Sequence, residues 1–228
     1  GHGPFSHSLE SILVPDFNHE MLTIQIMQRL NEEFNGKLSP AISIFENRYK
    51  KKFLHNLVSG QLDMDRLDYL NRDSFYTGVS EGVISSERII KMLNVHDGEL
   101  VVEQKGIYSI EKFLIARRLM YWQVYLHKTV LAAEQLLINI IRRAKEVFEA
   151  AGLAAITSSS LAYFLQSKTA EDLTKDDLVT RFCRIDDADV ISSVKEWMYC
   201  RDKTLSSLCT MLINRKLYKI KLSNSPIL

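Results

Sequence analysis

Apolar residues recur every three or four positions along most of this chain, the spacing that places them on one face of an α-helix. The clearest stretch, residues 107–151, contains neither glycine nor proline, and its apolar positions alternate by three and four from Val130 to Ala151. We expect one long amphipathic helix here, interrupted once near Tyr121. Shorter helices are predicted over residues 8–15, 19–34, 41–59, 63–76 and 205–217, with another beginning at 186–187.

One segment departs from this helical pattern. Between residues 88 and 108, two β-rich runs meet at His96-Asp97-Gly98, and the second run turns again at Lys105-Gly106. Asp-Gly between two such runs is typical of a hairpin turn. We therefore predict a small antiparallel β meander, and we interpret His96-Asp97 as its turn rather than as a metal-binding pair.

The composition supports a mostly α fold. Nine glycines and four prolines in 228 residues are about half of the average usage, too few for collagen-like, disordered or many-turned β classes. Gly152 and the cluster from Thr157 to Ser160 divide the pattern, so we expect a helical bundle with the β meander over residues 1–151 and a C-terminal helical subdomain over 152–228.

Charge and cysteine usage narrow the choice of partners. The formal net charge of +1 favours neither nucleic acid nor an anionic membrane surface. The longest uncharged run, residues 150–167, is typical of a small-residue loop followed by an amphipathic helix, so we expect no membrane span. Three cysteines without C-x-x-C spacing, Cys183, Cys200 and Cys209, indicate a reduced, cytoplasmic protein with buried thiols.

Histidines gather near the beginning of the sequence. His2, His7 and His19 fall within the first nineteen residues. Imidazole is the usual side chain for binding a divalent metal or moving a proton at neutral pH, so the three could converge on one pocket. The alternative is that His2 is a frayed terminus and His19 an ordinary first residue of a helix.

Carboxylates gather in the helix predicted over 63–76. On a helix, residues three, four, seven and eight apart share a face. Along one face of this helix the carboxylates are joined by a tyrosine and an arginine, and together they could bind a ligand. The alternative interpretation is a solvated surface held by ion pairs to Arg66 and Arg72. This face carries Asp65, Asp68, Tyr69, Arg72 and Asp73.

A third candidate set lies within the long helix. Arg117, Tyr121, Tyr125 and Lys128 are spaced by four, four and three, and therefore share a face. Such a face could present cations to phosphate and an aromatic ring to a base. Long side chains that merely extend into solvent are the alternative.

Three blocks together resemble the HD-domain phosphohydrolases, most closely the branch of deoxynucleoside triphosphate triphosphohydrolases. The likeness covers roughly residues 1–149 and is weaker around 176–220, and Asn18-His19-Glu20 also fits that branch. The blocks are Gly1-His2-Gly3-Pro4-Phe5-Ser6-His7, residues 63–73 (Asp-Met-Asp-Arg-Leu-Asp-Tyr-Leu-Asn-Arg-Asp) and Tyr125-Leu126-His127-Lys128.

The resemblance implies a divalent metal ion (Mn, Fe, Mg, Zn or Ni) bound by a first histidine, a His-Asp doublet and a later aspartate. By resemblance Asp65 is that last aspartate, and the other ligands would precede Gly1. We therefore expect residues 1–151 to be an N-terminally incomplete HD-type core, inactive as this fragment. The sequence is also expected to continue beyond residue 228, because the alternation from Leu217 to Leu222 is typical of a strand that needs a partner.

Roles for individual residues also follow from the resemblance. It implies hydrolysis of a deoxynucleoside triphosphate to deoxynucleoside and triphosphate, by a homo-oligomer in the intact protein. Other phosphate esters (a nucleoside monophosphate, a cyclic nucleotide or an alarmone), or a non-catalytic nucleotide-binding oligomerisation module, are the alternatives. The implied catalytic residues are His7 as the acid, His2 as a phosphate contact, His19 as a supporting imidazole, and Glu10, in place of an aspartate, to orient His19. The implied substrate contacts are Arg66 and Arg117 for phosphate, Tyr69 and Asp73 for the sugar, and Tyr125 near the base or sugar. Lys128 is added to the substrate contacts because of its helix face.

Overall fold

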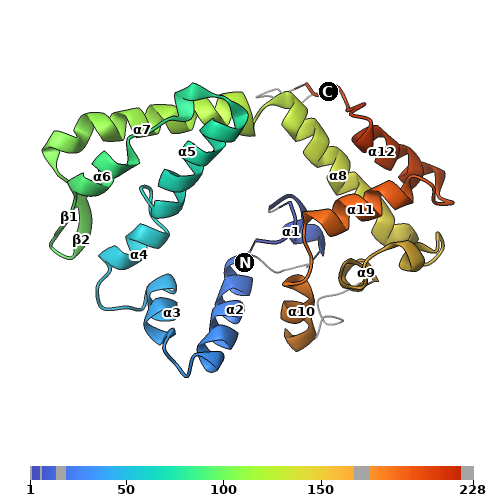
Figure 1. The fold of residues 1–228 in the computed structure, drawn as a ribbon, viewed down its shortest axis with the longest axis horizontal. Helices are drawn as coiled ribbons and strands as arrows, with labels where there is room; N and C mark the ends of the chain where they lie inside the picture. The colour runs from blue at the N-terminus through green and yellow to red at the C-terminus, as the bar shows by residue number, and fades with distance from the viewer. Residues whose placement is uncertain (1, 6, 14–18, 167–174, 222–228) are drawn as a thin grey trace. The chain divides into compact units, whose positions relative to one another are not determined.

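The computed structural model describes residues 2–5, 7–13, 19–166 and 175–221, and for residues 7, 10, 11 and 175–177 it describes the backbone alone. These residues form a mostly helical chain with one small antiparallel sheet, as predicted (Figure 1). The chain divides into two compact units, residues 1–29 with 131–228, and residues 30–130. The boundary predicted at residue 151 does not coincide with this division, because residues 131–148 share a hydrophobic core with the C-terminal helices.

The unit of residues 30–130 begins with short helices. A single helix over 41–59 is a wrong prediction, because Asn47 has a left-handed φ of +55° that interrupts the helical backbone. Asparagine adopts this conformation more readily than most residues, so neither glycine nor proline is needed at the break. The helices of this unit are α3 (Ser39–Phe45), α4 (Phe53–Val58), α5 (Met64–Thr77), α6 (Ser86–Met92) and α7 (Ile107–Met120).

The predicted β element is a two-stranded hairpin. Strand β1 (Leu93–His96) pairs antiparallel with β2 (Glu99–Val102), with His96 opposite Glu99. Asp97 and Gly98 both have positive φ, +50° and +82°, the conformation that a two-residue hairpin turn requires. The predicted turn is therefore confirmed at Asp97-Gly98, and His96 is the last residue of β1.

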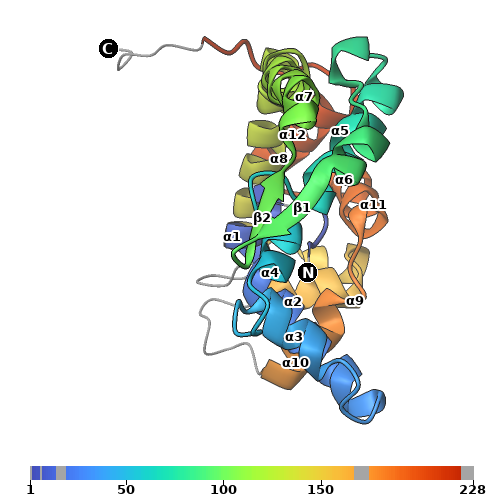
Figure 2. The same cartoon turned by 90° about the vertical axis from the view of Figure 1, so that its left-hand side faces the viewer.

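Helices α5 and α7 pack against each other and carry the candidate residues of this unit (Figures 1 and 2). Asp63 caps α5 by accepting a hydrogen bond of 2.8 Å from the Arg66 amide, and Gly78 ends the helix with φ +72°. Leucines from α5 meet large side chains from α7 in a separate small core. This core consists of Leu67, Leu70, Ile84, Ile89, Phe113, Ala116 and Met120.

The long helix predicted over 107–151 is interrupted at the expected place. Helix α7 ends at Met120, a π-helical turn covers Tyr121–Tyr125, and α8 (Lys128–Val147) follows. The Leu126 amide donates to the Tyr121 carbonyl at 2.8 Å, a bond across five residues that defines the wider turn.

The other unit is built around the buried face of α8. Trp197 is fully buried in its core, and its indole N–H donates to Thr157 Oγ1 at 3.1 Å. Residues 217–221 contain no strand, contrary to the alternation noted above. The helices are α1 (His7–Leu13), α2 (His19–Glu33, which continues past this unit), α9 (Ser159–Gln166), α10 (Lys175–Phe182), α11 (Asp187–Trp197) and α12 (Lys203–Ile213).

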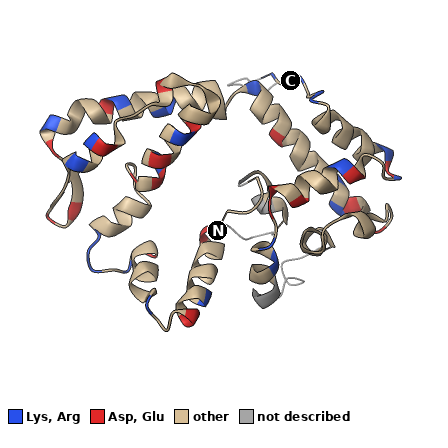
Figure 3. Cartoon of the chain, viewed as in Figure 1, with Lys and Arg blue, Asp and Glu red and all other residues tan. Residues whose placement is uncertain are grey.

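Cysteine and charge patterns complete the fold. Cys209 is buried and burial raises its pKa to about 12, but Cys183 is exposed and Cys200 half-buried, so the expectation of buried thiols holds for Cys209 alone. Acidic and basic residues are interspersed along α5 and α7 (Figure 3). Within the part of the chain that the structure describes, no helix has the length and apolar character needed to cross a bilayer.

Asp202 links α12 to α8 and gives a prediction about pH. It caps α12 by accepting from the Leu205 amide at 2.7 Å, and its two carboxylate oxygens accept from Arg143 at 3.2 and 2.7 Å. The hydrogen bonds from Arg143 and then from Leu205 hold the pKa of Asp202 below its usual range. A lowered folded-state pKa stabilises the fold above the unfolded-state pKa of about 3.9, and this stabilisation is lost as pH falls through the folded-state pKa.

We therefore expect Asp202→Asn to reduce stability at pH 7, with the difference from wild type shrinking below about pH 4. Urea denaturation at several pH values, followed by circular dichroism, measures this difference. Glu146→Gln is the matched control, because Glu146 contacts the same Arg143, at 2.9 Å, from an exposed position. A difference that persists unchanged at pH 2 would contradict the prediction.

Candidate functional site

A tyrosine, an aspartate and a second tyrosine meet between α5 and the π-helical turn. The Tyr125 hydroxyl donates a hydrogen bond of 2.6 Å to Asp73 Oδ2. Tyr69, one helical turn before Asp73, places its ring 6.1 Å from that of Tyr125 in an edge-to-face contact. Among the described residues Asp73 Oδ1 makes no hydrogen bond, so this oxygen can accept one from a ligand hydroxyl.

Arg117 and Tyr121 extend this cluster from α7. The Arg117 guanidinium lies 5.7 Å from the centre of the Tyr121 ring, and Tyr121 contacts the Tyr125 ring edge-to-face at 5.1 Å. Arg117 also lies close enough to Tyr69 to act on the pKa of its phenol. A chain of contacts therefore runs from Arg117 through Tyr121 to Tyr125, which in turn contacts Tyr69 and Asp73.

The electrostatic state of the cluster follows from its partial burial. Burial, then the hydrogen bond to Asp73, raises the pKa of Tyr125 well above its usual value. Burial also raises the pKa of Tyr69, an effect increased by Tyr121 and opposed by Arg117 and Arg66. Both phenols are therefore neutral at pH 7, so Tyr125 acts as a hydrogen-bond donor to a carboxylate beside a fixed cation.

The remaining predicted residues of this unit lie around the cluster. Asp65 is exposed in the first turn of α5, and Lys128 is exposed where α8 begins. Arg66 is half-buried and pairs with Asp63 and with the Gly60 carbonyl. Asp68 forms an exposed ion pair with Arg72, so the alternative of a salt-bridged surface holds for these two residues.

The histidine segment lies in the other unit and brings two of its histidines together. The rings of His2 and His19 stack with their centres 4.5 Å apart and an angle of 16° between them. The side chains of His7 and Glu10 lie outside the described part of the structure, as do Gly1, Ser6 and Asn18. The structure therefore brings His2 and His19 into contact with each other.

Close packing fixes the backbone of this segment. A Cβ at Gly3 would lie 2.5 Å from Cζ of Phe182, so only glycine fits against that buried ring.

Two side chains of α8 bind helix α1, which carries His7. Ser8 Oγ donates to Glu134 at 2.8 Å, and Lys145 Nζ donates to the Ile12 carbonyl at 2.6 Å. Burial lowers the pKa of Lys145.

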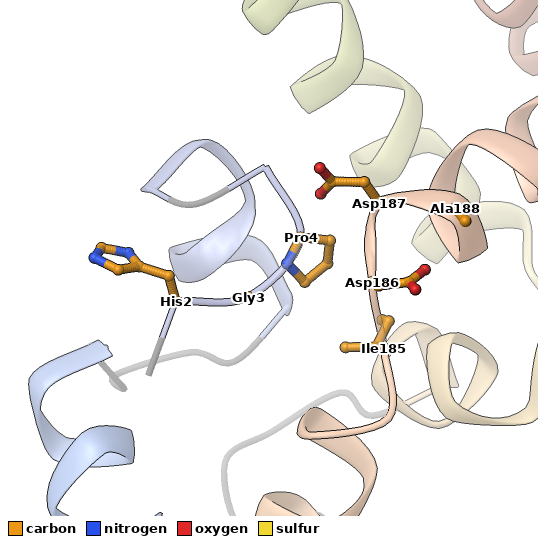
Figure 4. A pocket seen from close by; sticks show the side chains of 7 residues that line it. All are labelled: His2, Gly3, Pro4, Ile185, Asp186, Asp187 and Ala188. Carbon is orange, nitrogen blue, oxygen red and sulfur yellow. The ribbon is translucent and has the colours of Figure 1, made fainter. Parts of the chain in front are cut away.

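A pocket of about 320 Å³ lies beside the histidine segment. In Figure 4 the ring of His2 extends away from the acidic segment that forms the opposite wall. A 2.8 Å hydrogen bond from the Phe5 amide to Asp187 Oδ1 fixes that wall to the turn at Pro4-Phe5. The pocket is lined by His2, Gly3, Pro4, Ile185, Asp186, Asp187 and Ala188.

The described residues do not by themselves fit a catalytic metal ion. No group of three or more His, Cys, Asp or Glu side chains within the described ranges is placed to hold one. Asp65 alone supplies one carboxylate, and a catalytic metal in proteins normally has three or more protein ligands.

Sequence reasoning missed two residues that act on the candidate sites. Asp63 is the N-cap of α5 and pairs with the Arg66 side chain. A polar residue just before an amphipathic helix is the usual N-cap signal, and this signal could have identified Asp63. The other residue is Asp187, whose carboxylate accepts a hydrogen bond from the Phe5 amide. The two residues are 182 positions apart in the sequence, so no local signal predicts this contact.

Comparisons with known proteins agree with this architecture. The family model of the HD associated region matches residues 84–181. The crystal structure of a phosphohydrolase from Bacteroides thetaiotaomicron VPI-5482 is 53% identical with a TM-score of 0.94, over 99% of this chain and 56% of that one. YwfO from Bacillus subtilis (strain 168) is 32% identical, over 96% of this chain and 50% of that protein.

A more distant relative is named for an activity. A Dictyostelium discoideum protein described as a deoxynucleoside triphosphate triphosphohydrolase SAMHD1 homolog is 27% identical, over 65% of this chain and 32% of that protein. This chain thus spans about half, or less, of the length of each of these relatives. The similarities support the HD superfamily, and the HD-domain relatives suggest a phosphohydrolase.

Proposed function

We propose that this chain supplies the sugar- and phosphate-binding side chains of a metal-dependent phosphohydrolase that hydrolyses deoxynucleoside triphosphates to deoxynucleoside and triphosphate. The observation that carries the proposal is the hydrogen bond between Tyr125 and Asp73 beside Arg117. A neutral donor, a carboxylate acceptor and a cation within one cluster match the hydroxyl and phosphate groups of a nucleotide. The name of the Dictyostelium relative supports the same substrate class.

Each residue of the cluster has a proposed role. Asp73 accepts a hydrogen bond from a sugar hydroxyl, Tyr69 and Tyr125 enclose the sugar, and Arg117 binds phosphate. Arg66 would first have to exchange its contact with Asp63 for a phosphate oxygen. Lys128 is proposed as a further cation for the phosphates.

The histidine segment is proposed to supply the proton. His7 would donate it to the leaving 5′-oxygen, His2 would contact phosphate, His19 would support them, and Glu10 would orient His19. We propose Asp65 as one ligand of a divalent metal in the whole protein, with the other ligands outside the described residues. Its role rests on the resemblance, because the described residues complete no metal site.

The location, partners and assembly of the protein are proposed from its composition and from the resemblance. The absence of C-x-x-C spacing among the three cysteines supports a cytoplasmic location, and the near-neutral charge supports a partner other than nucleic acid or a membrane. We propose a homo-oligomer on the resemblance alone.

The direct test uses the whole protein that contains this chain. Each of the four deoxynucleoside triphosphates is incubated with it and with manganese, iron or magnesium, and the products are separated by chromatography. Deoxynucleoside and triphosphate in equal amounts are the expected products. Release of phosphate from a nucleoside monophosphate, a cyclic nucleotide or an alarmone instead would favour another HD-type activity, and binding without turnover would favour a nucleotide-binding module.

Tyr125→Phe tests nucleoside recognition, because it removes only the hydroxyl that binds Asp73. We expect KM for the preferred deoxynucleoside triphosphate to rise about tenfold, the usual effect of losing a hydrogen bond to a charged group. Hydrolysis of bis-p-nitrophenyl phosphate, which has no sugar, should change little. Tyr76→Phe is the control, since Tyr76 is an exposed tyrosine of the same α5 region. Equal effects on both substrates would exclude a role for Tyr125 in nucleoside recognition.

A further inference from the structure

The π-helical turn places Tyr121 directly beside Tyr125. Tyr121 and Tyr125 are the first and last residues of this turn, and residues four apart on a helical backbone are neighbours. The rings of Tyr121 and Tyr125 consequently meet edge-to-face, with 5.1 Å between centres and 77° between planes. Single π-helical turns inside α-helices are frequently found at functional sites.

Tyr121 is not a core residue. Its side chain is 39% exposed, whereas the neighbouring Met120 is fully buried and packs in the small core of this unit. The contacts of the Tyr121 ring are with Arg117 on one side and Tyr125 on the other. Its position is therefore explained by these two residues rather than by hydrophobic burial.

Both neighbours of Tyr121 have long or rotatable side chains that a single contact would not fix. The Arg117 guanidinium contacts the Tyr121 ring, and Tyr125 is held by Asp73 and by the rings of Tyr69 and Tyr121. Removing the Tyr121 side chain would take away the cation–π contact of Arg117 and one of the two aromatic contacts of Tyr125. Ordering these side chains before a ligand binds lowers the entropy cost of binding.

We propose that Tyr121 is a positioning residue, which holds Arg117 and Tyr125 in the geometry that receives the nucleotide. This inference rests on the function proposed above. Tyr121 acts through the faces and edge of its aromatic ring, by a cation–π contact to Arg117 and an edge-to-face contact to Tyr125. Its hydroxyl has no part in the proposed role.

Steady-state kinetics of the whole protein with the four deoxynucleoside triphosphates test the proposal. Tyr121→Leu should raise KM about tenfold, the combined worth of one cation–π and one aromatic contact, and should change kcat less. Tyr121→Phe keeps the ring and should recover most of the affinity. Tyr108→Leu, the same change at an 80% exposed tyrosine of α7 outside the cluster, is the control. An unchanged KM for Tyr121→Leu, or equal damage by Phe and Leu, would overturn the proposal.

A second measurement separates this inference from the proposed function. If the wild-type protein neither binds nor hydrolyses any of the four nucleotides, the proposed function fails, and the contact of Tyr121 is then measured by urea unfolding. The shifts in midpoint for Tyr121→Leu and Tyr125→Leu should be non-additive in the double variant, because either change removes the same ring contact. Additive shifts would show that Tyr121 does not hold Tyr125 in place.

Discussion

Trp197→Ala should lower the free energy of unfolding by about 3–5 kcal/mol, the range measured when a large aromatic side chain is removed from a packed core. Trp197 is fully buried among the helices that surround α8. The substitution would leave a cavity that backbone relaxation fills only in part, and it would leave Thr157 without the indole N–H, 3.1 Å away, as its donor.

Urea denaturation followed by circular dichroism measures the loss. Tyr199→Ala is the matched control, because Tyr199 lies two residues further along the chain and is 85% exposed. We expect this control to change stability by no more than about 0.5 kcal/mol. Trp197→Phe should fall between the two, since it keeps much of the volume but not the hydrogen bond. A loss of less than about 1 kcal/mol for Trp197→Ala would show that the core closes around the gap.

The helices and the turn of the hairpin were predictable because their signals are local. The run from 107 to 151 without glycine or proline predicts a long helix, and Asp97-Gly98 predicts a two-residue turn. The break between α3 and α4 could not be predicted in this way. Asn47 tolerates a left-handed φ without the glycine or proline that usually marks a helix end.

The candidate cluster was predictable in two halves but not as a whole. Helical spacing places Tyr69 and Asp73 on one face of α5, and Arg117, Tyr121 and Tyr125 on one face of the following helix. That the two faces meet depends on the packing of the small core around Leu70 and Met120, which brings α5 and α7 together. Spacing also does not reveal the π-helical turn over Tyr121–Tyr125, which is defined by a backbone bond across five residues.

The division of the chain was the least predictable feature. Gly152 has a left-handed φ of +67° in the turn that follows α8, and the small residues after it are typical of a linker. However, the buried face of α8 shares one hydrophobic core with Leu9, Leu13 and Leu22 and with residues of the C-terminal helices. The contacts with Leu9, Leu13 and Leu22 join segments more than a hundred residues apart, so no local pattern reports them.

Asp65→Ala is expected to have the largest effect on activity. If Asp65 is a metal ligand in the whole protein, as the proposed function requires, the substitution should reduce hydrolysis at least about a hundredfold, because loss of a second-shell partner alone costs about 10–100-fold. The fold should be unaffected, since Asp65 is exposed and Asp63 provides the N-cap of α5. The far-ultraviolet circular dichroism spectrum should therefore match that of wild type.

Metal content gives the decisive readout, because it does not depend on the choice of substrate. The whole protein is purified, dialysed against metal-free buffer, and its bound metal is measured by mass spectrometry. Asp68→Ala is the matched control, one turn along α5, because Asp68 is exposed and forms an ion pair with Arg72. Loss of bound metal in Asp65→Ala but not in Asp68→Ala is the expected result. Equal metal content and turnover in all three proteins would remove Asp65 from the metal site, and the cluster around Tyr125 would then have to be interpreted as a nucleotide-binding site alone.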